Sequence, residues 1–270
     1  MKRLTICADD FAASQDISQG IASLAGLGRI SATSVMALSP RWAADAALLR
    51  DVRGRIDVGL HLDWTSEFAR AAGHGVSLRG AMLRAVLGGF DQAAARTVIA
   101  RQLDAFEAAW QGPPDHIDGH QHVQQFAGIR QALVTVVQER YAINKRAYFR
   151  LSTPALADRG LKARIISSLG AAALARLAGS VGIACAPALS GIYDFSGGGQ
   201  RYAGLMDRWL HDAPAGAIIM CHPAVRAEPA DELGEARAWE YDYLASDAFP
   251  QALARAAVTL ERGSRLDPDA

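Results

Sequence analysis

The chain has 270 residues, of which 50% are hydrophobic and 21% are charged, and this composition excludes a disordered or fibrous protein. The length is enough for one barrel or α/β domain, or for two smaller domains. Because 28 basic residues balance 28 acidic ones and no basic run occurs, a nucleic-acid partner held by bulk charge is not expected. The three cysteines, Cys7, Cys185 and Cys221, are too few and too dispersed for a disulfide framework or a cysteine-rich zinc site.

No segment has the pattern of a signal peptide or a membrane span. The first residues lead directly into an apolar run that is too short for a signal-peptide core. Residues 165–192 are weakly polar, but Arg176 interrupts them and alanine and glycine dominate, which favours a buried helix followed by a strand. We therefore expect a cytoplasmic protein without stable membrane insertion.

Predicted strands and helices alternate along the chain. Apolar runs predict strands at 4–8, 31–38, 57–62, 116–119, 147–151, within 183–193 and at 217–221. Helical periodicity predicts helices over 15–27, 41–53, 92–110, 129–141, 161–177, 202–210 and 246–260. Residues 63–89 are expected to form a long loop with a short helix near Leu83, and 224–240 a polar loop. This alternation indicates a parallel sheet covered by helices, and seven strand–helix units favour a closed (β/α) barrel in a single domain over residues 1–262, with a polar tail at 263–270.

Four predicted strands end in an acid or a histidine. These ends are Asp9-Asp10, His61, the segment His116-Ile117-Asp118-Gly119-His120-Gln121-His122, and His222. Functional groups of barrel enzymes gather at the carboxyl ends of the strands, so we expect the four clusters to meet at one rim. Two histidines and one carboxylate make a plausible catalytic metal site, and the remaining acids and histidines are available for proton transfer. The alternatives are a polar turn with solvated histidines and, for the acid pair, a helix cap by Asp10 or Ser14.

Four motifs together resemble the YdjC-like carbohydrate deacetylases, which include enzymes that act on chito-oligosaccharides and others tied to hopanoid biosynthesis. The motifs are Cys7-Ala8-Asp9-Asp10-Phe11, Val58-Gly59-Leu60-His61-Leu62, His116 to Val123, and Met220-Cys221-His222-Pro223. They extend from residue 7 to residue 223 in the family's order. The resemblance implies a distorted (β/α) TIM-like barrel with seven or eight parallel strands.

The resemblance also implies a set of residue roles. A divalent metal, zinc or magnesium in the first place and otherwise manganese, nickel or cobalt, would be held by Asp10, His61 and His120. Asp9 would be the general base and His222 the general acid, while Arg150 would orient a carboxylate or form a structural ion pair. Chemistry of this kind needs a metal to polarise the amide carbonyl, a base for water and an acid for the leaving amine.

Four further residues are candidates for a supporting role. Asp118 lies two residues before His120, close enough to orient a histidine, and His122 is expected to support the site. Phe11 and Trp64 are candidates for stacking against a sugar, with a place in the core as the alternative. Two positions depart from the family pattern: Ala12 stands where glycine is usual, and Gln124 stands where relatives often have histidine.

The sequence therefore predicts a metal-dependent hydrolase that removes an acetyl group from an N-acetylated sugar, either a chito-oligosaccharide or a glycolipid headgroup. A metal-dependent phosphoesterase or lyase with the same fold, and a non-catalytic sugar or lipid binder, are the alternatives. Homodimer formation is left open.

Overall fold

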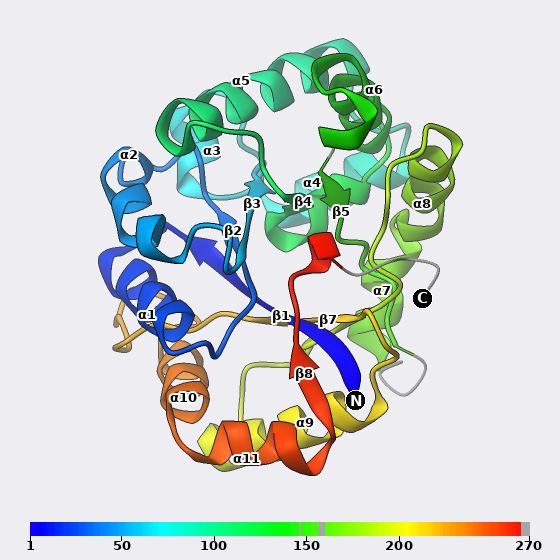
Figure 1. Ribbon diagram of the computed structural model, residues 1–270. Helices are drawn as coiled ribbons and strands as arrows, with labels where there is room; N and C mark the ends of the chain where they lie inside the picture. The colour runs from blue at the N-terminus through cyan, green and yellow to red at the C-terminus, as the bar shows by residue number, and fades with distance from the viewer. Residues whose placement is uncertain (146, 156–159, 266–270) are drawn as a thin grey trace.

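A curled parallel sheet forms the centre of the molecule, and helices surround it (Figure 1). The computed structural model describes residues 1–145, 147–155 and 160–265. Seven strands follow the order β5-β4-β3-β2-β1-β7-β6, and β8 pairs with β1 outside this path. The strands are β1 (Lys2–Phe11), β2 (Ala32–Val35), β3 (Asp57–Leu62), β4 (His116–Gly119), β5 (Tyr148–Phe149), β6 (Leu189–Ser190), β7 (Ile218–Cys221) and β8 (Val258–Leu260).

The barrel is distorted where β5 and β6 would meet. Isolated parallel bridges, Phe149 to Cys185 and Pro154 to Leu189, join these two chain segments in place of a continuous ladder. Both strands are only two residues long, and Pro154 and Pro187 have no N–H to donate to a ladder. The expected distorted (β/α) barrel is therefore confirmed as a single α/β domain whose sheet curls without a regular closing seam.

Eleven α-helices and four short 3-10 helices occur in the described residues. The α-helices are α1 (Gln15–Gly26), α2 (Trp42–Asp45), α3 (Glu67–Ala71), α4 (Leu78–Val86), α5 (Gln92–Trp110), α6 (Ile129–Arg140), α7 (Leu161–Ser168), α8 (Ala171–Ser180), α9 (Gly198–Asp212), α10 (Gly234–Ala245) and α11 (Ala248–Arg255). The 3-10 helices are η1 (Ala46–Val52), η2 (His120–Gln125), η3 (Ile143–Lys145) and η4 (Gly263–Arg265). None of the helices described is long and apolar enough to cross a bilayer.

The helix predictions were best where a cap or a clear apolar face marked the helix. Ser14 caps α1 by accepting a hydrogen bond from the Ile17 backbone, and α5 has the predicted bounds. The predicted helix over 161–177 divides into α7 and α8 at Gly170, whose φ of 134° breaks the helical path. The predicted helix over 41–53 divides into α2 and η1.

The C-terminal third contains two wrong predictions. The expected polar loop over 224–240 ends in helix α10, which begins at Gly234. The expected helix over 246–260 stops at Arg255, because Ala257 adopts a left-handed φ of 52° and the chain continues as strand β8 beside β1 (Figure 1). Residues 266–270 of the predicted tail lie outside the described residues, while Ser264 in η4 donates a 2.5 Å hydrogen bond to Asp57.

Candidate active site

A bulge at the end of β1 turns two consecutive aspartates toward the same rim. Neighbouring residues of a regular strand point to opposite faces of the sheet. The pairing of β1 with β2 shifts register between Ala8 and Phe11, and Asp10 adopts a left-handed φ of 68°. The extra residue lets both Asp9 and Asp10 line one cavity.

The turn that follows contains Ala12 at a φ of 71°, a conformation that favours glycine. The Ala12 backbone N–H donates to Ser18 Oγ at 3.0 Å, and its carbonyl accepts from Ser39 Oγ at 2.6 Å. These two hydrogen bonds hold the strained turn in place. The alanine at this family glycine position therefore keeps the left-handed turn.

Asp10, His61 and His120 converge, and one potential ligand atom from each lies within 4.8 Å of the others. Asp10 Oδ1 is 3.5 Å from His61 Nε2 and 3.1 Å from His120 Nδ1. Two imidazoles and one carboxylate are a donor set typical of a catalytic divalent metal site. The buried His/Asp cluster is thus compatible with a metal ion.

Asp118 fixes the ring of His61. The Nδ1 atom of His61 lies 2.5 Å from Asp118 Oδ1, and this contact leaves Nε2 facing Asp10. Burial alone would lower the pKa of His61, but the neighbouring Asp118 and Asp9 raise it well above the ordinary value. A carboxylate on the far nitrogen of a metal-binding histidine sets both its orientation and its basicity.

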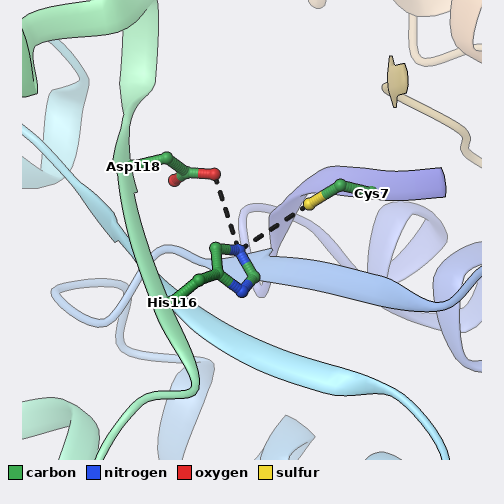
Figure 2. Close-up of side chains that lie close together, drawn as sticks. All are labelled: Cys7, His116 and Asp118. Atoms are coloured by element: carbon green, nitrogen blue, oxygen red, sulfur yellow. Dashed lines mark hydrogen bonds and ion pairs between the residues drawn. The ribbon is translucent and has the colours of Figure 1, made fainter. Parts of the chain in front are cut away.

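Cys7 and His116 lie beside Asp118 in a buried cluster (Figure 2), and Ser34 joins them. The Ser34 hydroxyl lies 3.3 Å from Cys7 Sγ, 2.9 Å from His116 Nε2 and 2.5 Å from Asp118 Oδ2. Gly59 makes room for His116, because a Cβ at position 59 would lie 2.4 Å from the imidazole ring. This cluster is fully enclosed, and Ser34 links its members, so it positions Asp118.

Asp9 is held by a two-point ion pair. Arg150 Nη1 and Nη2 lie 2.6 and 2.7 Å from the two carboxylate oxygens of Asp9, and Nη2 also lies 2.9 Å from Asp118 Oδ2. Burial alone would raise the pKa of Asp9, but the charges of Arg150 and His61 hold it below the ordinary value. Asp9 is therefore ionised near neutral pH.

His222 lies on the other side of Asp9, with its Nε2 atom 3.8 Å from Asp9 Oδ2. The Phe195 ring packs edge-to-face against it at 5.3 Å, and its backbone N–H donates to Glu240 Oε2 at 2.5 Å. Burial lowers the pKa of His222 to about 4, so its ring is neutral near neutral pH.

Two residues of the site, Arg237 and Glu240, were missed in the sequence because they lie in the segment predicted as a loop. Arg237 Nη2 bonds Asp10 Oδ2 at 2.7 Å, and its Nε bonds Asp231 at 2.6 Å. Glu240 accepts a 2.7 Å hydrogen bond from the Tyr193 hydroxyl. Their spacing of three residues, which places them on one face of a helix, is the signal that could have identified them.

The candidate ligands open into a cavity of about 580 Å³. Its polar wall includes Asp9, Asp10, His61, His120 and His222, and apolar side chains form most of the remainder. His122 lines the cavity too, and its Nδ1 lies 2.9 Å from Ser152 Oγ. Gln124, which departs from the family pattern, holds the backbone at Arg150, because its side-chain amide donates to the Arg150 carbonyl at 3.0 Å.

Phe11 and Trp64 do not line this cavity. Phe11 is fully buried and packs edge-to-face against Trp42 at 6.2 Å. Trp64 is 3% exposed and packs against Phe90 at 6.3 Å. Both belong to the hydrophobic core, so the alternative of a core position fits them. The aromatic side chains of the cavity wall are those of Phe126, Tyr193 and Phe195, and the last of these packs against His222.

Three solved structures resemble this fold. A protein from Enterococcus faecalis, for which cellobiose-phosphate cleavage has been suggested, matches with a TM-score of 0.73 at 18% identity over 97% of each chain. The CE4 domain of a multidomain xylanase from the hindgut metagenome of Trinervitermes trinervoides matches with a TM-score of 0.51 at 10% identity, over 97% of this chain and 87% of that one. A family 4 acetyl xylan esterase from Clostridium thermocellum, in complex with a cobalt ion, matches with a TM-score of 0.51 at 11% identity, over 97% and 88%.

The sequence comparisons identify the family. No curated protein matches the chain. The family model for YdjC-like proteins matches residues 3–255, which is nearly the whole sequence. The four motifs at the strand ends all lie inside the matched region, and the fold is the one shared with family 4 carbohydrate esterases. The chain therefore belongs to the family of YdjC-like proteins.

Proposed function

We propose that this protein is a metal-dependent N-deacetylase of N-acetylated sugars. The observation that carries the proposal is the convergence of Asp10, His61 and His120 on one side of a cavity that also exposes Asp9 and His222. In such a reaction water adds to the acetamide carbonyl, the C–N bond breaks, and acetic acid and an amine leave, which near neutral pH are present as acetate and an ammonium group.

Asp10, His61 and His120 would hold the metal. Asp118 bonds His61 Nδ1, and Arg237 bonds Asp10 Oδ2. His61 Nε2 and Asp10 Oδ1 therefore remain as the atoms that can bind the metal. The bound ion would polarise the acetyl carbonyl and lower the pKa of a water molecule. Zinc and magnesium are the proposed ions, and the cobalt ion in the Clostridium thermocellum esterase supports a divalent metal in this fold.

Asp9 is the proposed general base. Its carboxylate is ionised and lies beside the metal site, with Oδ2 4.0 Å from His61 Nε2. Arg150 fixes both oxygens, so the carboxylate cannot rotate away from the cavity. A base held within reach of water contributes rate through both proton transfer and orientation.

His222 is the proposed general acid. Because its ring is neutral before reaction, it must gain a proton before it donates one to the leaving amine. Asp9 Oδ2 lies 3.8 Å from His222 Nε2, so the proton that Asp9 takes from water has a short path to the ring. The amine then leaves protonated, and both residues return to their starting states.

The composition of the cavity favours an uncharged sugar over a phosphate ester. Arg150 and Arg237 are paired with Asp9, Asp118, Asp10 and Asp231. Of the lysine and arginine side chains that the structure describes, Lys162 alone lines the cavity. Phosphoester chemistry would need more cationic groups at this point. The proposed substrate is a chito-oligosaccharide or a glycolipid headgroup.

The test is acetate release from a panel of N-acetylglucosamine-containing substrates, with Asp9→Asn as the matched variant. The proposal predicts acetate from the wild-type protein and at least a hundredfold less from Asp9→Asn, with bound metal retained. A non-catalytic binder would bind the substrates equally well with either residue and release no acetate from either protein, and that result would overturn the proposal.

A further inference from the structure

Two short helices, α4 and α7, lie on the wall of the same cavity. Leu78 and Met82 of α4 and Leu161 and Ile165 of α7 line it. Helix α4 contains nine residues and α7 contains eight. Their outer surfaces therefore form part of the surface around the cavity opening.

These helices hold most of the exposed apolar side chains. Ten large hydrophobic residues are exposed in the described part of the chain, and six of them belong to α4, to the residue after it, or to α7. The six are Leu78, Leu83, Val86, Leu87, Leu161 and Ile165. Leu87 and Leu161 are 74% and 75% exposed. Single exposed leucines are ordinary, but a concentration on two helices that border one cavity marks an interaction surface.

The same segments carry positive charge without any acid. Residues 78–90 contain Arg79 and Arg84, residues 160–193 include Lys162 and Arg164, and neither segment contains an aspartate or glutamate. The whole chain has a formal net charge of zero, so these two segments are more basic than the chain as a whole, while Asp91 and Asp194 directly follow them and Glu232 lies on the cavity wall. We call the surface formed by Leu78–Leu87 and Leu161–Ile165 the mouth surface.

We propose that the mouth surface docks reversibly onto an anionic phospholipid bilayer. Apolar side chains interspersed with arginine and lysine on short helices are the features of segments that lie in the interface of a membrane. Anionic headgroups complement Arg79, Arg84 and Arg164, and the leucine and valine side chains reach the apolar layer below. The fourth cation, Lys162, donates to the Tyr193 carbonyl at 2.7 Å in the cavity wall. The helices are far too short to span the bilayer, so contact is limited to its surface.

The charge of the mouth surface also argues against a second copy of this chain as its binding partner. In a twofold symmetric contact the same patch faces itself, so the cations of both subunits would be brought into one interface that offers them no acid from the same patch. Like charges placed opposite one another oppose such a contact. A bilayer with anionic headgroups supplies the missing opposite charge.

The inference does not rest on the proposed deacetylase reaction, and its test requires no turnover. Purified protein is mixed with phosphatidylcholine vesicles, with or without about 30% phosphatidylglycerol, and bound protein is separated by flotation. The protein should float with the anionic vesicles and stay in solution with pure phosphatidylcholine. Raising the salt from about 0.05 M to about 0.5 M should weaken the binding, because salt screens exposed charges.

Two variants of the mouth surface and one control separate this contact from general stickiness. Leu83→Gln/Val86→Gln/Leu87→Gln removes exposed apolar side chains that do not line the cavity, and vesicle affinity should fall at least tenfold. Arg79→Gln/Arg164→Gln should lower it by about fivefold for each charge removed. The control Leu48→Gln/Arg50→Gln changes an exposed leucine and arginine on η1 and should bind like the wild type.

Equal binding to both kinds of vesicle, or unchanged binding by the mouth-surface variants, would overturn the proposal. The proposal would also be overturned if the protein did not bind vesicles but formed a concentration-dependent dimer that the triple variant abolishes. The mouth surface would then bind a second copy of the chain. The charge variant keeps the test decisive if the triple variant fails to fold, which thermal unfolding would reveal.

Discussion

Arg150 and Asp9 form a two-point ion pair, with both guanidinium–carboxylate distances at or below 2.7 Å and both side chains almost completely buried. The pair joins β1 to the segment after β5, 141 residues along the chain. It holds the proposed base in one orientation and keeps its pKa low. A planar guanidinium is suited to this arrangement, whereas a lysine ammonium is not.

Replacing Arg150 should therefore change the pH dependence of the reaction. The proposed base works only when ionised, so activity is present above the pKa of Asp9 and lost as pH falls through it. Arg150→Lys should lower kcat/KM by about a hundredfold, because a point charge cannot fix both oxygens. The acidic limb of the kcat/KM profile should also move to higher pH. If Arg150→Lys is active and the acidic limb of its kcat/KM profile is unchanged, Arg150 does not set the pKa of the base.

Asp118→Asn should weaken metal binding. The variant loses the charge that sets the orientation and basicity of His61, and the loss of such a partner lowers metal affinity by about 10–100-fold. Competition with a chelating dye measures this affinity directly. Asp115→Asn is the matched control, because Asp115 lies next to the same strand and bonds the Val58 backbone instead. Equal losses in both variants would mean that the effect is on folding.

Glu240→Gln should change how stability depends on pH. Burial raises the pKa of Glu240 to about 7 from 4.5, so between these values the folded state binds more protons than the unfolded state. The folded protein consequently loses stability as pH rises through this window, by roughly 3 kcal/mol for a group this buried.

Urea unfolding at several pH values measures the effect. The wild-type free energy of unfolding should fall across the window relative to that of Glu240→Gln, in which position 240 does not titrate. If the free energies of unfolding of the wild type and of Glu240→Gln change in parallel from acidic to neutral pH, Glu240 does not have the raised pKa.

The convergence of the acid and histidine clusters was predictable because each is tied to a strand end, whereas the choice of metal ligands among them came from the resemblance to the family. Asp10 and His61 lie in the last two residues of β1 and β3, His120 follows β4 directly, and the carboxyl ends of parallel strands share one edge whatever the details of packing. The same rule predicted that His222 lies at this edge, and it follows β7 directly. Strand bounds were less predictable at β5 and β6, where two-residue strands give almost no periodic signal.

Other features depended on tertiary contacts that leave little trace in the sequence. Arg237 reaches Asp10 across 227 residues, and no local pattern encodes that pairing. Phe11 was a candidate for sugar contact because it follows the acid pair, but the bulge at Asp10 and the left-handed turn at Ala12 are needed to decide which way it points. A backbone of that kind could not be foreseen from strand alternation alone.

The central claim is that this chain hydrolyses an N-acetyl group with the help of a metal held by Asp10, His61 and His120. The most direct measurement is acetate release from N-acetylglucosamine oligosaccharides by chelator-treated protein as a divalent metal is returned. We predict that acetate release is lost on chelation, returns as about one metal ion per chain binds, and does not return in His120→Ala. Acetate release that is indifferent to the chelator, or that returns equally in His120→Ala, would contradict the account.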